Sequence, residues 1–128
     1  MTTTTYGRTR YFEAPELAYR MSVAMDRSDT WSPHAQLLCW VLMPDHWHGL
    51  VRLQDAASLS KVIGLAKGRS ARAVGMLATP IWAAGFHDRA LRRDEDILKA
   101  ARYIVANPIR AGLVASVRCY PYWNSAWL

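Results

Sequence analysis

Two histidines stand two positions apart in an otherwise mostly apolar stretch. They are His46 and His48, within residues 43–51. Side chains of a β-strand alternate between its faces, so both imidazoles are expected on the same face. Adjacent imidazoles can each give one ring nitrogen to a metal ion. The pair is a candidate metal site, whereas either histidine alone would be read as a structural residue of a sheet.

A tyrosine and an asparagine stand four residues apart in a second candidate segment. A helix is predicted over residues 94–107, with Asp94 as its N-cap and Pro108 ending it. Tyr103 falls outside the apolar stripe of this helix, and Asn107 is expected one turn later on the same face. Lys99 lies one turn earlier on that side. The stripe consists of Ile97, Leu98, Ala101, Ile104 and Val105.

These side chains together suit phosphodiester chemistry. Two imidazole nitrogens and the amide oxygen of Asn107 form a mixed donor set that suits Mg²⁺ or Mn²⁺ shared with a phosphate. Such a metal polarises the phosphodiester. Tyr103 is then a candidate nucleophile that forms a phosphotyrosine. A free phenol is protonated near neutral pH, so it needs activation by the metal or by a neighbour such as Lys99.

The elements that must position these residues follow from the sequence periodicity. Strands are predicted over residues 2–6, 34–43, 46–53 and 85–91, and helices over 15–26, 58–77 and 94–107. Pro44 and Asp45 predict a tight turn between the second and third strands. The order β-α-β-β-α-β-α predicts an α+β fold of the split βαβ (ferredoxin or RRM-like) type, an antiparallel sheet with helices packed on one face.

Composition limits the class of protein. The 128 residues predict a single domain over 1–128, and 52% hydrophobic residues are typical of a folded chain. Only Cys39 and Cys119 are present, without a CxxC pair, which argues against a disulfide scaffold or a zinc ribbon. There is no run long enough for a membrane span and no signal-peptide pattern at the start, so we expect a cytoplasmic protein without membrane association.

The charge balance favours a polyanionic partner. The formal net charge is +6, which makes nucleic acid the first partner to consider, although many small proteins are basic without binding it. The candidate contacts to backbone phosphates are Arg8, Arg10, Lys61, Lys67, Arg69, Arg72, Arg92, Arg93 and Lys99.

Several stretches resemble a known superfamily. The sequence His46-Trp47-His48 resembles the His-hydrophobic-His motif of the HUH endonucleases, and residues 103–108 resemble the tyrosine helix of the single-tyrosine transposases. Residues 40–48, 85–88, 103–114 and 120–124 resemble the REP-associated tyrosine transposases, a bacterial branch of that superfamily.

The resemblance implies an HUH-type fold and a specific activity. Such proteins cut single-stranded DNA near imperfect palindromic hairpins, form a 5′-phosphotyrosine and rejoin strands by attack of a 3′-OH. By position, His46 and His48 match the metal-binding pair, Tyr103 the nucleophile and Asn107 the third polar ligand of Mg²⁺ or Mn²⁺. The resemblance implies single-stranded or hairpin DNA as partner and favours a monomer over a homodimer. His87 and Asp88 match a recurring motif without an assigned role.

Two alternatives remain open beside this leading hypothesis. One is a non-catalytic module that binds single-stranded nucleic acid on an RRM-like fold, although no RNP-like aromatic run is present on a strand. The other is a metal nuclease that uses activated water and forms no tyrosine adduct.

Overall fold

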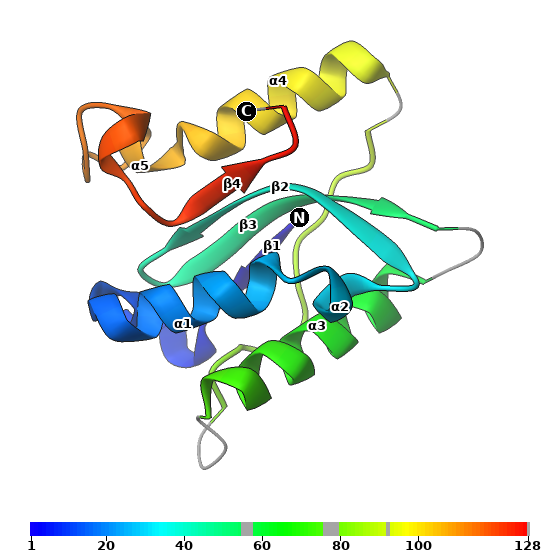
Figure 1. Ribbon diagram of the computed structural model, residues 1–128, viewed down its shortest axis with the longest axis horizontal. Helices are drawn as coiled ribbons and strands as arrows, with labels where there is room; N and C mark the ends of the chain where they lie inside the picture. Colours follow the sequence, from blue (N-terminus) through cyan, green and yellow to red (C-terminus); the bar gives the residue numbers. More distant parts are fainter. Residues whose placement is uncertain (55–57, 76–79, 92, 128) are drawn as a thin grey trace.

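A four-stranded antiparallel sheet organises the chain in this computed structural model, which describes residues 1–54, 58–75, 80–91 and 93–127 (Figure 1). The strand order is β1-β3-β2-β4. The strands are β1 (Thr2–Thr4), β2 (Ala35–Met43), β3 (His46–Leu53) and β4 (Trp123–Ser125). The α-helices are α1 (Pro15–Asp26), α2 (Ser28–Trp31), α3 (Leu59–Val74), α4 (Asp94–Val105) and α5 (Asn107–Arg110). Short 3-10 helices span Tyr6–Arg8, Tyr11–Glu13 and Val117–Cys119.

The predicted hairpin at the centre of the sheet is confirmed. Strands β2 and β3 pair antiparallel with Met43 opposite His46, so the tight turn falls on Pro44 and Asp45. Strand β1 pairs with the other edge of β3, with Thr4 opposite His46 and Thr2 opposite His48. Each histidine therefore sits on an inner strand with a neighbouring strand on both sides.

The predicted α+β fold with an antiparallel sheet is confirmed, but helices cover both faces of this sheet and not one face as predicted. Helices α1, α2 and α3 lie on one side, and α4 and α5 lie on the other, where α4 contacts β2, β3 and the edge strand β4 (Figure 1). A large core lies between these three helices and the sheet. It contains Phe12, Met21, Met25, Trp31, Trp40, Leu42, Trp47, Val62 and Ile63. A small core on the second side contains Cys39, Val41, Met43, Ala101 and Ile104. Strand β2 is apolar on both faces, and each face therefore needs a cover.

The fourth strand lies elsewhere than predicted. Residues 85–91 do not form a strand of the sheet. This segment touches β1 through an isolated bridge from His87 to Thr2, and Trp82, just before it, bridges to Thr5. The fourth strand is instead β4, which pairs with β2 and places Trp123 opposite Val41. This strand comes from the aromatic segment near the C-terminus, which the sequence pattern did not distinguish from an irregular tail.

The predicted third helix is interrupted near its end. Helix α4 stops at Val105, Ala106 serves as its C-cap, and a new short helix α5 begins at Asn107 with Pro108 in its first turn. Proline is well accommodated in the first turn of a helix, so Pro108 starts α5 as well as ending α4. Within the described residues, no helix is both long and apolar enough to span a membrane.

The predicted second helix agrees with α3 over its described part. Ser58 caps its start by accepting a hydrogen bond from the Lys61 amide, and Gly75 ends it at a φ of +85°. The last two residues of the predicted range, 76 and 77, lie outside the described residues. Helix α3 is on the opposite side of the sheet from α4 (Figure 1).

Candidate active site

The histidine pair lies on the sheet face that α4 covers. His46 and His48 are opposite Met43 and Val41, which belong to the small core, whereas Trp47 between them lies in the large core. Directly opposed residues of antiparallel strands point to the same face. The predicted shared face is thus present, and it carries the two imidazoles toward the helix that holds Tyr103.

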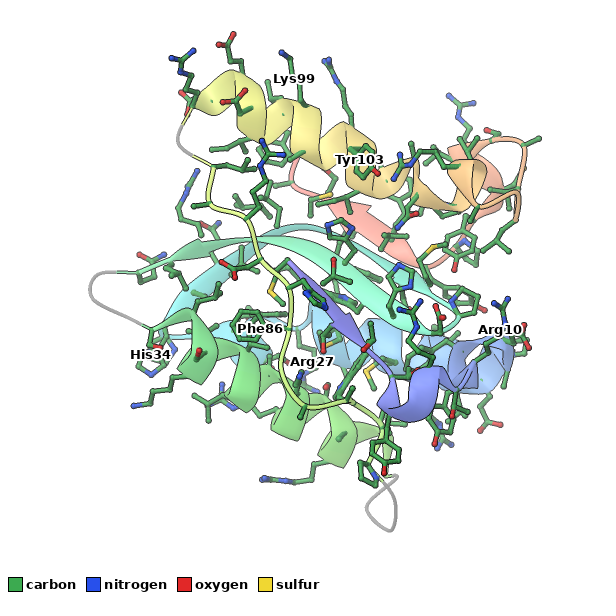
Figure 2. All side chains as sticks on the ribbon, turned by 180° about the vertical axis from the view of Figure 1, so that it is seen from behind. Arg10, Arg27, His34, Phe86, Lys99 and Tyr103 are labelled. Atoms are coloured by element: carbon green, nitrogen blue, oxygen red, sulfur yellow. The ribbon has the colours of Figure 1, made fainter. Side chains whose placement is uncertain are left out.

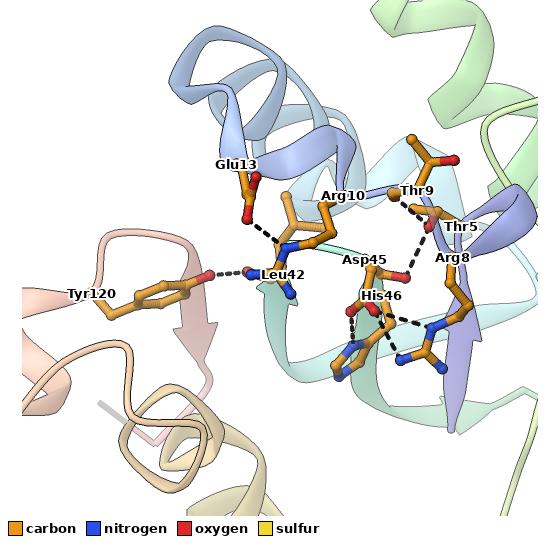
Figure 3. Close-up of polar contacts among 9 residues, drawn as sticks. All are labelled: Thr5, Arg8, Thr9, Arg10, Glu13, Leu42, Asp45, His46 and Tyr120. Carbon is orange, nitrogen blue, oxygen red and sulfur yellow. Dashed lines mark hydrogen bonds and ion pairs between the residues drawn. The ribbon is translucent and has the colours of Figure 1, made fainter.

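Asp45 holds the ring of His46 through a hydrogen bond (Figure 3). Its Oδ1 is 2.9 Å from the Nδ1 of His46, and its Oδ2 accepts from the Nε and Nη2 of Arg8 at 3.0 and 2.9 Å. Burial alone would raise the pKa of Asp45, but the hydrogen bonds from His46 and Arg8, with their positive charges, lower it overall. The carboxylate is therefore ionised at neutral pH and favours a proton on Nδ1, which leaves Nε2 free.

The backbone around Asp45 is also fixed. Its carbonyl oxygen accepts from the Thr5 amide at 2.9 Å and from the Thr5 hydroxyl at 3.1 Å. Gly7 and Arg8 both have positive φ, at 65° and 55°, and turn the chain so that Arg8 reaches Asp45. A non-glycine residue rarely adopts such a φ and needs surrounding contacts to hold it there.

His48 is more deeply placed and uncharged. Burial, followed by the positive charges of the amino terminus, His46 and Arg110, lowers the pKa of His48 to about 4. Its imidazole is neutral at physiological pH and has a nitrogen lone pair available to a metal ion.

A cleft of about 910 Å³ lies between the sheet and α4. Its walls come from β1, β3, the segment after Gly85, and α4. The lining residues include Thr2, His48, Leu50, His87, Asp88, Arg93, Lys99 and Tyr103. The cleft thus brings His48 together with Tyr103 and Lys99, and places the motif residues His87 and Asp88 beside them.

Tyr103 is the accessible tyrosine of this region. It lies outside the small core, as predicted, and 58% of the residue is exposed (Figure 2). The guanidinium carbon of Arg110 lies 3.5 Å from the centroid of its ring. Tyr120 offers a contrast: burial raises its pKa to about 12, and its hydroxyl donates to the carbonyl of Leu42 (Figure 3). Tyr103 is therefore the better placed nucleophile.

The helix that was predicted to run to Asn107 ends at Val105, so Tyr103 and Asn107 belong to two successive helices, α4 and α5. The position of Asn107 one turn beyond Tyr103 stays a prediction. Asn107 is half-buried at the start of α5 and is not among the residues that line the cleft. Within the described residues, no group of three or more His, Cys, Asp or Glu side chains is arranged so that it could hold a metal ion. A third ligand from Asn107 stays a prediction.

The predicted phosphate contacts fall into two groups, of which the first already has protein partners. Arg8 binds Asp45 and Arg10 binds Glu13 (Figure 3). Lys67 donates to the carbonyls of Ala83 and Gly85, and Arg69 donates to three carbonyls in and just after α2, those of Asp29, Thr30 and Ser32. Burial lowers the pKa of Lys67. These side chains hold the fold together.

The second group is exposed and less firmly held; its Arg93 has a long ion pair with Glu95, at 3.9 Å. Lys61 and Arg72 are on α3, across the sheet from the cleft. Arg93 and Lys99 line the cleft itself, and Figure 2 shows Lys99 on the same helix as Tyr103. Arg92 lies outside the described residues. Arg93 and Lys99 are therefore the predicted contacts that the structure places beside the candidate nucleophile.

Two residues of this region were not singled out from the sequence. Asp45 was assigned to a turn, and Arg110 belonged to a matching motif without a role. The neighbouring position of Asp45 and His46 in the sequence was a usable signal. Arg110 had none, because its contact with Tyr103 depends on the break between α4 and α5.

Comparison with known proteins places the chain among transposases. The family model described as "Transposase IS200 like" matches residues 5–87, a range that contains both histidines and ends before Tyr103. A solved structure of a REP-associated tyrosine transposase bound to a REP hairpin has a similar fold, with a TM-score of 0.70 and 23% sequence identity. The similarity covers 95% of this chain and 72% of that one. None of the curated proteins matches the sequence.

Proposed function

The chain belongs to the family of IS200-like transposases, and we propose that it nicks and joins single-stranded DNA near palindromic, REP-type hairpins through a 5′-phosphotyrosine. The observation that carries the proposal is the cleft shared by His48 and Tyr103. The similar fold of a transposase whose structure contains a REP hairpin supports this class of DNA as the partner.

The histidine pair suits a divalent cation. The hydrogen bond with Asp45 engages the Nδ1 of His46 and leaves its Nε2 for a metal ion, and the low pKa of His48 leaves that ring with a nitrogen lone pair. We propose that these two side chains hold Mg²⁺ or Mn²⁺ together with the DNA phosphate, with Asn107 as a third ligand. When bound, the cation would polarise the phosphodiester and offset its charge.

In the proposed reaction the phenol oxygen of Tyr103 attacks phosphorus. A new O–P bond forms as the bond from phosphorus to the 3′ oxygen breaks. The phenol loses its proton to solvent, and the departing 3′ oxygen takes up a proton and becomes a 3′-OH. One phosphoester bond replaces another, so no ATP is needed. Joining is the reverse reaction with the 3′-OH of another strand.

The basic side chains of the cleft have a role separate from that of the metal ion in this proposal. Arg93 and Lys99 line the same cleft as Tyr103 and are suited to backbone phosphates of the bound strand. Because His48 and Tyr103 line one cleft of a single chain, we further propose that the active site is completed in cis by a monomer.

The test is formation of a covalent protein–DNA product. The protein is incubated with Mg²⁺ or Mn²⁺ and a single-stranded hairpin oligonucleotide. The label is placed in the fragment that keeps the 5′-phosphate after cleavage, and the products are separated under denaturing conditions. We expect a band that EDTA suppresses and that Tyr103→Phe abolishes. Tyr19→Phe is the matched control, since Tyr19 is also exposed but lies on α1, across the sheet.

Each rival function gives a different result. Cleavage that persists in Tyr103→Phe without a covalent band would support a nuclease that uses water. Hairpin binding without cleavage in either metal would support a non-catalytic binding module. Mixing Tyr103→Phe with His48→Ala tests the assembly: recovery of the band in the mixture would show that the active site is shared between two chains.

A further inference from the structure

Arg110 is a charged side chain in direct contact with the candidate nucleophile. Its guanidinium carbon lies 3.5 Å from the centroid of the Tyr103 ring, so the planar cation stacks on the ring face. Both residues are exposed to solvent on the side of the sheet that α4 covers. This contact is outside both cores and is not required to fill either of them.

The contact depends on the break between the two helices. In one continuous helix, residues 103 and 110 would be separated by about 10 Å along the axis, at 1.5 Å per residue. The chain instead leaves the helix at Ala106 and begins α5 at Asn107, which carries Arg110 back onto the ring. Pro108 is buried in the first turn of α5 and supports this change of direction.

The charge of Arg110 acts on the metal half of the site. It is one of the positive charges that lower the pKa of His48, and its guanidinium also contacts the ring of Tyr103. None of the ion pairs formed by the described residues involves Arg110. A guanidinium that stacks by its face still has its N–H donors directed outward in the plane, where they match phosphate oxygens.

We propose that Arg110 is a catalytic residue that holds the ring of Tyr103 with its face and binds the non-bridging oxygens of the scissile phosphate with its edge. This inference rests on the proposed function. The guanidinium offsets the charge that develops on the phosphoryl oxygens as the phenol oxygen bonds to phosphorus and the 3′ oxygen departs. Arg110 stays protonated throughout and exchanges no proton with the reactants.

The test separates rate from affinity. Arg110→Ala, Arg110→Lys and wild type are compared by the single-turnover rate of covalent adduct formation at saturating hairpin DNA, and by the Kd for the same DNA in the presence of Ca²⁺. Loss of one preorganised donor at a developing charge lowers rates by about 100-fold or more. We expect that loss for Arg110→Ala, a smaller one for Arg110→Lys, and a Kd within about threefold of wild type, since one phosphate contact is removed.

A matched control and a rescue exclude a merely structural or general electrostatic role. Arg102→Ala removes an exposed arginine of α4, next to Tyr103 in sequence, and should keep the wild-type rate. Millimolar guanidinium should accelerate Arg110→Ala, whereas sodium chloride at equal ionic strength should not. A structural role would not respond to free guanidinium.

The outcomes distinguish this inference from the function on which it rests. If wild type forms no adduct, the proposed function fails. If wild type reacts and Arg110→Ala keeps a rate within about threefold of it, Arg110 is not catalytic. A higher Kd with an unchanged saturated rate would make Arg110 only a binding residue, which also overturns the inference. If Arg110→Ala does not fold, the same comparison is made with Arg110→Lys and Arg110→Gln.

Discussion

Asp45→Asn is the change that most directly tests how the metal half of the site is built. The substitution keeps the size of the side chain and removes its charge. Its carbonyl oxygen can still accept from His46, but its amide nitrogen then faces the donors of Arg8. The preference for a proton on Nδ1 of His46 weakens, and with it the availability of Nε2 to a metal ion.

The expected effect on stability is modest. Arg8 is 62% exposed at its side chain, so its ion pair with Asp45 contributes at most about 1 kcal/mol. The bond to His46 is better protected, with 20% and 18% of the two side chains exposed, and contributes about 1 kcal/mol. Together these terms predict a loss of roughly 1–2 kcal/mol from the free energy of unfolding.

The expected effect of Asp45→Asn on metal affinity is larger than its effect on stability. Loss of a carboxylate that orients a metal-ligating histidine lowers metal affinity by about 10- to 100-fold. Titration calorimetry with Mn²⁺ measures this directly, and the Mn²⁺ concentration that gives half-maximal adduct formation measures it in the reaction. Arg8→Ala should give a smaller loss in both assays, because Arg8 acts through Asp45.

Asp29→Asn is the matched control. Asp29 accepts from Nε and Nη2 of Arg27 at 3.0 and 2.9 Å, much as Asp45 accepts from Arg8, but it contacts no histidine. It should leave the Mn²⁺ affinity unchanged. If Asp45→Asn binds Mn²⁺ within about threefold of wild type while His46→Ala loses binding, Asp45 does not orient the metal ligand and the reasoning is refuted.

Two further predictions concern packing and charge. Gly49→Ala should lower the free energy of unfolding in urea by roughly 1–3 kcal/mol, because the new Cβ would lie 2.1 Å from the fully buried Trp47 ring, whereas Gly68→Ala, which meets no atom within 4 Å, should not destabilise the protein. Lys99→Ala should weaken binding to single-stranded DNA, reduce the log–log slope of its salt dependence by about 0.7, and leave stability unchanged. Lys67→Ala should leave DNA binding unchanged and lower the free energy of unfolding by about 1 kcal/mol. Fluorescence anisotropy measures the binding and urea unfolding measures the stability.

The strand half of the site could be predicted because its information is local. The alternation of residues 46–53 assigns each side chain to a face, and Pro44 with Asp45 determines where the hairpin turns. The bounds of β3 and α1 agree with the predicted ranges for the same reason. A shared face for His46 and His48 followed from a period of two alone.

The errors arose where distant residues decide the outcome. The fourth strand is β4, which comes more than 30 positions after residues 85–91 and pairs with the edge of β2, whereas residues 85–91 only bridge to β1 at the other edge. That helices cover both faces depends on where α4 packs, which its own stripe does not determine. Pro108 was correctly recognised as ending a helix, but a stop signal does not exclude a new helix one residue later.

The helix half of the site combines these two situations. The helical period of 3.6 placed Tyr103 off the apolar stripe of α4 and put Ala101 and Ile104 on it. The structure agrees, because Tyr103 is exposed and the other two residues are buried in the small core. The same period predicted one helix through Asn107, but it holds only while the helix continues, and α4 ends at Val105. Across this break, Arg110 of α5 packs its guanidinium on the ring of Tyr103. A motif with a proline between two polar residues should therefore be read as two rigid pieces joined at a corner, and the residue after the corner deserves the same scrutiny as the one before it.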